Sequence, residues 1–123
     1  MKLLLIDDSL YVLKVIVKAL KNHFPEAEIE TASNGNDGLA CYQTFKPDYL
    51  ITDLLMPELS GQEVIKRIRE NDKTTKIIVI SADVQISTKL EISEYDVLQF
   101  INKPINEEKA KQLIDMIKED FIA

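Results

Sequence analysis

The chain contains little cysteine, glycine or continuous apolar sequence, and each scarcity excludes a class of protein. The only cysteine, Cys41, cannot form an internal disulfide, which excludes a disulfide-stabilised fold and fits a reducing compartment. Only three glycines occur in 123 residues, and they form no glycine-rich phosphate loop, which argues against a mononucleotide-binding protein. The apolar run at the amino terminus, Leu3–Ile6, meets two aspartates and is too short for a signal peptide or a membrane span. These features predict a cytoplasmic protein without membrane insertion.

Basic residues are in the minority. The 15 Lys and Arg residues face 21 Asp and Glu residues, which leaves a formal net charge of -6 and no basic run. Because nucleic acids and anionic membranes require clustered Lys and Arg, we expect no direct nucleic-acid binding.

No repeat, low-complexity tract or Pro/Gly/Ser linker divides the sequence. Residues 1–123 are therefore expected to form a single domain, with no output domain.

Five short segments rich in Ile, Leu and Val are predicted to be strands, because polar or turn residues bound each of them. They are Lys2–Ile6, Glu28–Ala32, Tyr49–Thr52, Lys76–Ile80 and Val97–Ile101. Segments such as the first and the fourth are apolar at nearly every position, which indicates strands covered on both faces, as in a parallel sheet. The second segment alternates and fits a sheet edge.

Segments of helical period separate these strands. The first extends from Ser9 to Phe24, and the next three start at Asn34, at Ser60 and near Gln85, while the last begins at Asn106 and Glu107. The fourth helix has the weakest signal, because its Ile, Ser and Thr residues are mediocre helix formers. Strict alternation of strands and helices predicts right-handed crossovers and a doubly wound α/β fold with a five-stranded parallel sheet.

Polar residues at the carboxyl ends of the strands form the candidate site, because doubly wound sheets bind ligands there. Asp7 and Asp8 follow the first strand, Asp53 ends the third, Ser81 follows the fourth and Lys103 follows the fifth. Three neighbouring carboxylates repel one another unless a hard cation neutralises them, and Mg²⁺ prefers such oxygen ligands. A lysine ammonium and a hydroxyl can bind oxygens of an anion attached to one carboxylate. The set predicts a phosphoryl-transfer site.

The ordered motifs resemble the signature of response regulator receiver domains across essentially the whole chain. They are Asp7-Asp8, Asp53-x-x-Met56-Pro57-x-x-x-Gly61, Ser81-Ala82 and Lys103-Pro104. The resemblance implies a flavodoxin-like (βα)5 fold with strand order 2-1-3-4-5. It also implies a phosphoacceptor signalling domain of a two-component phosphorelay rather than an enzyme, although the domain assists its own phosphorylation and dephosphorylation.

The resemblance assigns the phosphoryl and metal chemistry to particular residues. Asp53 would accept a phosphoryl group from a phosphohistidine of a sensor histidine kinase or of a phosphotransfer protein. Asp8, Asp53 and the backbone carbonyl of Leu55 would ligate Mg²⁺, or Mn²⁺ in its place, and Asp7 would act mainly through a bound water. Lys103 would contact one phosphoryl oxygen. The remaining structural residues near the site would be Met56 and Pro57 in the loop behind the acceptor, Gly61 at the tight start of the third helix, and Pro104.

The output is expected to run through Ser81 and Phe100, by the same resemblance. The Ser81 hydroxyl would move to a phosphoryl oxygen, and Phe100, at the switch position, would change the surface of the fourth helix, fifth strand and fifth helix for an unidentified downstream protein. Because Phe100 has no hydroxyl to form a hydrogen bond, we expect signalling through its exchange between rotamers to depend on packing alone. The stretch Tyr95-Asp96-Val97 departs from the small residues common in relatives at that place, which leaves the packing of the fourth helix open.

Two positions are expected to control hydrolysis of the phosphoryl group. Leu55 and Asp83 lie two residues beyond Asp53 and Ser81, where residues of relatives border the approach of water. An apolar Leu55 should hinder water more than a polar residue, so we expect a persistent phosphoryl group.

Three rival functions fit parts of the same pattern. A hydrolase with an aspartyl nucleophile uses similar groups, but its Asp-x-Asp pair follows the first strand, and the extra segment that usually encloses a substrate is missing. A mononucleotide-binding flavodoxin-like protein would need a glycine-rich loop. A receiver-like module that has lost phosphorylation is disfavoured by the complete set of acidic, hydroxyl and lysine residues.

Overall fold

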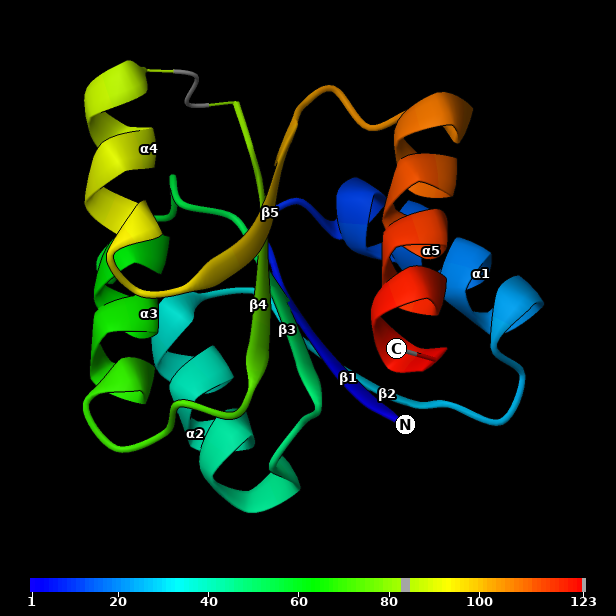
Figure 1. Cartoon of the computed structure of the whole chain (residues 1–123), viewed down its shortest axis with the longest axis horizontal. Coiled ribbons are helices and arrows are strands. Elements are labelled where there is room, and N and C mark those ends of the chain that lie inside the picture. The colour runs from blue at the N-terminus through cyan, green and yellow to red at the C-terminus, as the bar shows by residue number, and fades with distance from the viewer. Residues whose placement is uncertain (83–84, 123) are drawn as a thin grey trace.

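The computed structural model describes residues 1–82 and 85–122, and five strands alternate with five helices in them (Figure 1). The strands are β1 (Lys2–Ile6), β2 (Glu28–Ala32), β3 (Tyr49–Thr52), β4 (Lys76–Ser81) and β5 (Val97–Asn102). The helices are α1 (Leu10–His23), α2 (Gly35–Phe45), α3 (Gly61–Arg69), α4 (Ile86–Ser93) and α5 (Glu107–Ile122). All ten predicted elements are confirmed, and β4 and β5 are each one residue longer than expected.

The sheet has the strand order β2-β1-β3-β4-β5, and every neighbouring pair is parallel. Helices α1 and α5 cover one face, and α2, α3 and α4 cover the other (Figure 1). This arrangement confirms the doubly wound fold and the order that the resemblance implied. Among the described residues, no helix combines the length and the apolarity needed to cross a bilayer.

Two apolar cores lie on the two faces of the sheet, and β1 contributes to both. Leu3 and Leu5 pack against α1 and α5, while Leu4 and Ile6 pack toward α2 and α3. Alternate side chains of a strand point to opposite faces, so a strand buried on both sides is apolar throughout. The edge strand β2 alternates instead, with exposed glutamates, as its sequence predicted.

Polar side chains cap the helices at the predicted starts. Ser9 Oγ accepts a hydrogen bond from the Val12 backbone N–H at 3.3 Å, and Asn34 and Ser60 cap α2 and α3 in the same way. Each cap satisfies a backbone N–H that has no partner within its helix. Because these helices start directly beyond β1, β2 and the loop after β3, the caps help to fix the carboxyl edge of the sheet.

The atypical stretch before β5 is accommodated by a positive φ and by an arginine. Asp96 adopts a left-handed conformation with φ of 59°, which L-residues other than Asn and Asp rarely tolerate. Arg69 Nε donates a hydrogen bond to the Tyr95 carbonyl at 2.6 Å, and Arg69 Nη2 donates to the Asp96 carbonyl at 3.2 Å. The Tyr95 side chain packs against the core on the α3 side. The stretch therefore joins α4 to β5 without the small residues common in relatives.

Candidate functional site

Strand pairing brings Asp7 and Asp53 together. Ile6 and Thr52, the last residues of β1 and β3, are direct partners in the sheet, so the aspartates that follow them emerge side by side. The Asp53 backbone N–H continues the ladder by donating to the Ile6 carbonyl at 3.0 Å. Both aspartates are only 4% exposed. Buried carboxylates need compensating partners, and each has them here.

Lys103 lies between the two buried carboxylates. Its Nζ is 3.0 Å from Asp7 Oδ2 and 3.0 Å from Asp53 Oδ2. Burial lowers the pKa of Lys103, but the hydrogen bonds to Asp7 and Asp53 outweigh it and raise the pKa above its ordinary value. The ammonium therefore stays charged at neutral pH and holds the two carboxylates together.

The opposite oxygen of Asp53 is held by the backbone. Asp53 Oδ1 accepts hydrogen bonds from the Leu54 N–H at 2.7 Å and from the Leu55 N–H at 3.2 Å. The carboxylate thus has a fixed orientation, with one oxygen toward the loop and the other toward Lys103. The Leu55 side chain is exposed beside it. The metal role of the Leu55 carbonyl remains a prediction.

The third carboxylate, Asp8, completes an all-oxygen cluster. One oxygen from each of Asp7, Asp8 and Asp53 lies within 4.8 Å of the others, and Asp8 is exposed to solvent. Burial raises the pKa of Asp7, although hydrogen bonds from the Ser9 backbone and from Lys103 oppose this shift. One ammonium balances only one of the three negative charges. The donor set therefore fits a hard divalent cation, which takes oxygen ligands and tolerates an open, solvated position.

Gly61 allows α3 to start directly against the backbone of the acceptor residue. A Cβ at this position would lie 1.9 Å from the Asp53 carbonyl oxygen and 2.7 Å from the Leu54 Cα. Its N–H donates to the Leu54 carbonyl at 3.0 Å, and its φ is not positive. The helix starts tightly here because two backbones approach closely, not because the residue adopts a left-handed conformation.

The loop between Asp53 and α3 is anchored by Met56 and turned by the residues after it. Met56 is buried in the core on the α3 side, whereas Pro57 is exposed. Glu58 follows with φ of 66°, and the Leu59 N–H donates to the Pro57 carbonyl at 2.8 Å. The shaping of this loop by Met56 and Pro57 stays a prediction.

Ser81 is the last residue of β4 and is completely buried. Its backbone carbonyl accepts a hydrogen bond from the Lys103 N–H at 3.0 Å, and the Lys103–Pro104 peptide bond is cis. The hydroxyl and the lysine are thereby brought to the same edge of the sheet as the aspartates. Asp83, expected to border the path of water, lies outside the described residues.

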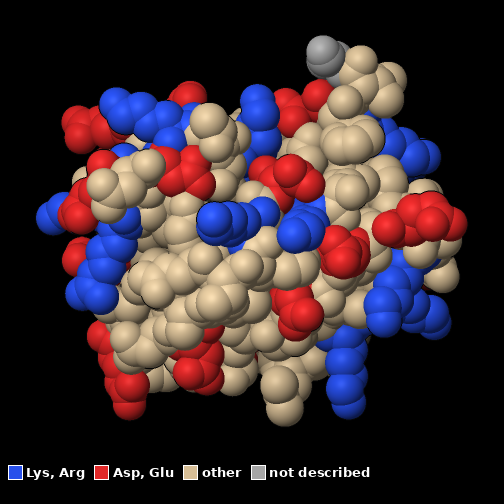
Figure 2. All heavy atoms as spheres, turned by 90° about the horizontal axis from the view of Figure 1, so that it is seen from below, with Lys and Arg blue, Asp and Glu red and all other residues tan. Residues whose placement is uncertain are grey.

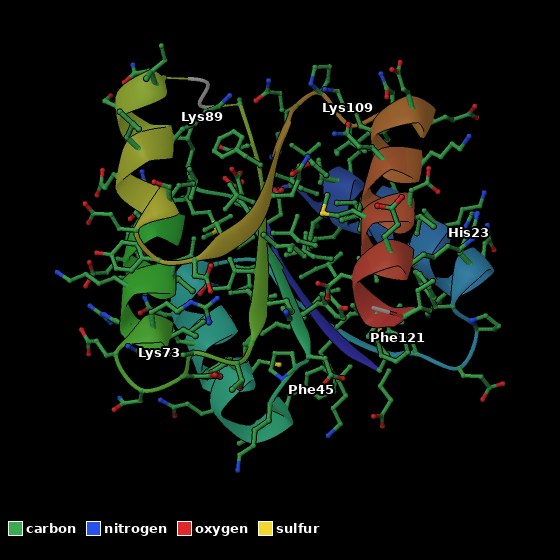
Figure 3. The ribbon with its side chains drawn as sticks, viewed as in Figure 1. His23, Phe45, Lys73, Lys89, Lys109 and Phe121 are labelled. Carbon is green, nitrogen blue, oxygen red and sulfur yellow. The ribbon has the colours of Figure 1, made fainter. Side chains whose placement is uncertain are left out.

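Phe100 has an interaction that sequence reasoning missed. Its ring is half-buried on the α4 side of β5, and the Lys89 ammonium lies 4.9 Å from the ring centroid. Figure 3 shows that Lys89 extends from α4 toward the sheet. The expectation that Phe100 relies on packing alone needs correction, because a cation–π contact adds to the packing. No sequence signal reveals this pair, since it depends on how α4 docks.

Comparisons with known proteins identify the family. The chain matches the family described as response regulator receiver domain over residues 3–115. It is 29% identical to chemotaxis protein CheY of Listeria monocytogenes, over 94% of this chain and 96% of that protein. It is 30% identical to the probable C4-dicarboxylate response regulator DctR of Priestia megaterium, over 94% of this chain but only 50% of that protein.

Solved structures of similar proteins have the same fold. Chemotaxis response regulator CheY4 of Vibrio cholerae superposes with a TM-score of 0.82 at 27% identity, over 94% of this chain and 97% of that one. The N-terminal domain of a Wolinella succinogenes protein gives a TM-score of 0.86 at 28% identity, over 99% and 97% of the two chains. The chain therefore belongs to the response regulator receiver domain family.

Proposed function

We propose that this chain relays a two-component signal by accepting a phosphoryl group on Asp53 from a phosphohistidine of a sensor histidine kinase or a phosphotransfer protein. The observation that carries the proposal is the buried Lys103 ammonium, which contacts Asp7 and Asp53 at 3.0 Å beside a third carboxylate. A purely structural ion pair would not need three converging carboxylates. The expected location is the cytoplasm.

The residues around Asp53 prepare it for in-line attack. A carboxylate oxygen of Asp53 forms a bond to phosphorus as the phosphorus–nitrogen bond breaks, and the bonding electron pair stays on the imidazole nitrogen of the partner. The backbone N–H groups of Leu54 and Leu55 fix the carboxylate during this step. Lys103 can bind a phosphoryl oxygen with one of its N–H groups while another remains on Asp7.

A divalent cation fits the remaining negative charge of the cluster. Asp8, Asp53 and the Leu55 carbonyl would hold Mg²⁺ or Mn²⁺, with Asp7 contributing through a water molecule. When bound, the cation supplies neutralisation of the phosphoryl oxygens. The domain acts on no separate substrate in this scheme, so it is a phosphoacceptor rather than an enzyme, although it assists both gain and loss of its own phosphoryl group.

Output would follow from movement of Ser81 toward the phosphoryl group. The Ser81 backbone is tied to Lys103, and Phe100 lies near the end of the neighbouring strand. Loss of the resting position of Ser81 would change the packing around Phe100 and its contact with Lys89. The surface of α4, β5 and α5 would then change its affinity for a downstream protein.

The test is phosphorylation by a small phosphodonor, read by intact mass. Acetyl phosphate with Mg²⁺ is expected to add one phosphoryl group to the wild type and to the matched control Asp115→Asn, which alters an exposed aspartate on α5. Asp53→Asn or chelation of the metal should abolish the addition. Undiminished labelling of Asp53→Asn, or no labelling of the wild type, would contradict the proposal.

The lifetime of the phosphoryl group gives a second test. Because Leu55 is 54% exposed beside Asp53, its apolar side chain can hinder the approach of water. We expect Leu55→Asn to shorten the lifetime, measured as the decay of phosphorylated protein after removal of the donor. An unchanged or longer lifetime would show that Leu55 does not obstruct hydrolysis.

A further inference from the structure

An open groove of about 690 Å³ lies between α1 and the edge strand β2, away from the cluster of aspartates. Its apolar lining comes from Leu10, Leu13 and Val17 on the helix and from Ile29 on the strand. Leu10 is 65% exposed, and Val17 and Ile29 are only partly buried. The groove therefore offers apolar surface along the first half of α1, from Leu10 to Val17.

Three lysines, Lys14, Lys18 and Lys21, also line this groove, and no carboxylate is among its described lining residues. Helix α1 contains no Asp or Glu in its 14 residues. The acidic side chain of Glu30 on β2 points away from the groove. Glu30 pairs with Leu4 and therefore lies on the same face of the sheet, toward α2. The groove is consequently positive on a chain with a net charge of -6.

The other large grooves among the described residues are not charged in this way. In the groove between α3 and the segment before β5, Lys66, Arg69 and Lys73 are accompanied by three acidic side chains. In the groove between α1 and α5, Glu107 balances one of the two lysines, Lys18 and Lys111, so the excess positive charge is smaller. Basic and acidic side chains are also interspersed on the face at the amino ends of the strands (Figure 2). Three lysines without a carboxylate among the described lining residues therefore distinguish the α1–β2 groove.

We propose that the α1–β2 groove binds an acidic amphipathic α-helix of a partner protein. The lysines recur at steps of four and three residues along α1, or about 6 Å and about 4.5 Å along its axis. A helix that lies alongside α1 has the same rise and can place Asp or Glu opposite each lysine. Leu10 and Val17, with the buried Leu13 between them, form an apolar row beside the lysines, which matches the apolar face of a helix bound in a groove.

The charge and shape of the groove favour this occupant over a membrane or a nucleic acid. Both alternatives are extended polyanions that would also lie against acidic surface outside the groove on a chain with a net charge of -6, whereas a single helix contacts only the groove and its three lysines. A bilayer is also too broad to enter a groove bounded by one helix and one strand. An extended peptide added to the β2 edge would use backbone hydrogen bonds, and it would not require the helical spacing of the lysines. The proposal does not depend on phosphorylation of Asp53.

The experiment measures binding of a fluorescein-labelled synthetic peptide of about five helical turns, with Leu on one face and Glu along both borders of that face. The matched variants are K14Q/K18Q/K21Q and, as the control of equal charge change, K66Q/K73Q/K111Q. All six lysines are exposed, so neither set should alter the fold. Fluorescence anisotropy gives the affinity, and NMR amide shifts give the location.

We expect the groove variant to bind the helical peptide about tenfold more weakly than wild type, because three exposed ion pairs are lost. The control variant should bind within about twofold of wild type, since nonspecific attraction alone is modest. Amide shifts should centre on Val17 and Ile29. Higher salt should weaken binding to wild type more than binding to the groove variant.

Several outcomes would overturn the proposal. These are no binding by wild type, equal weakening in the two triple variants, and shifts centred on α4 and β5. Tighter binding of an extended peptide with alternating Leu and Glu would identify a strand as the occupant. Lysine-dependent binding to anionic phosphatidylglycerol vesicles, with no binding of the peptide, would identify a membrane. Lysine-dependent self-association in sedimentation, again without peptide binding, would identify a second copy.

Discussion

Gly61→Ala is the most informative single substitution for the link between packing and the site. The new Cβ would lie 1.9 Å from the Asp53 carbonyl oxygen, about 1.5 Å short of the 3.4 Å of ordinary contact. The two nearest other atoms, the Leu54 Cα and the Asp53 carbonyl carbon, are also backbone. No side chain can rotate away to relieve the clash, so the start of α3 and the Asp53 backbone must move apart.

The expected cost is large for a single methyl group. Overpacking against rigid structure costs about 3 kcal/mol, and the better helix propensity of alanine returns less than about 1 kcal/mol. For a domain of this size the melting temperature should fall by roughly 10 °C. A displacement of about 1 Å at the acceptor carboxylate should also slow phosphorylation by about 100-fold.

Gly38→Ala is the matched control, because it makes the same change in α2. The three nearest atoms to its Cβ would all belong to the Ile6 side chain, Cδ1 at 2.3 Å, Cγ1 at 2.8 Å and Cγ2 at 3.2 Å, and a side chain can rotate away where a backbone cannot. We expect its stability to stay within about 1 kcal/mol of wild type, since helix propensity offsets the local crowding. Its phosphorylation rate should not change.

Urea denaturation followed by circular dichroism measures stability, and intact mass after timed exposure to acetyl phosphate and Mg²⁺ measures the rate. A Gly61→Ala protein as stable as Gly38→Ala, and phosphorylated at the wild-type rate, would refute the reasoning. A stable protein with a slow rate would place the strain in the loop after Asp53 rather than in the fold.

Three further experiments test other parts of the structure. Asp96→Gly should stabilise the protein by about 1 kcal/mol, because glycine tolerates the left-handed φ of 59°; a loss of stability in urea would contradict this. Burial and a hydrogen bond to Asp72 raise the pKa of Tyr42 to about 12. The stability that the neutral Tyr42 hydroxyl contributes is therefore complete below pH 10 and is lost as pH rises through 12. Between pH 10 and pH 12 the Tyr42→Phe protein should therefore lose less stability than wild type. Equal losses would show that the Tyr42 hydroxyl does not contribute in this way. A double-mutant cycle of Lys89→Met and Phe100→Leu should give a coupling of about 0.5–1 kcal/mol, and additive effects would exclude the cation–π contact.

The order of elements and most of the site could be predicted from local sequence. Apolar runs such as Leu3–Ile6 report burial on both faces of a sheet, and helical period and caps such as Ser9 mark the helices. Residues at the carboxyl ends of parallel strands share one edge. The convergence of Asp7 and Asp53 therefore followed from their positions relative to two strands, without knowledge of any distance.

Contacts between elements could not be predicted in this way, because they depend on how separate elements dock. The stretch Tyr95-Asp96 gave no sign that Arg69, on another helix, would satisfy its carbonyls. The same is true of Lys89 above Phe100, where a cation was unexpected. In both cases the contact comes from a side chain distant in sequence, so local sequence patterns do not reveal it.

What the sequence alone determined about this protein is its element order, its parallel sheet and the identity of the acidic residues, since these depend on periods of a few residues. Only the tertiary structure decided that Lys103 bridges two buried carboxylates and that Gly61 lies against the Asp53 backbone. It likewise decided that the lysines of α1 border an apolar groove free of carboxylates among its described residues. The physical reason is that burial, close approach and charge balance are set by neighbours in space, which sequence periodicity does not specify.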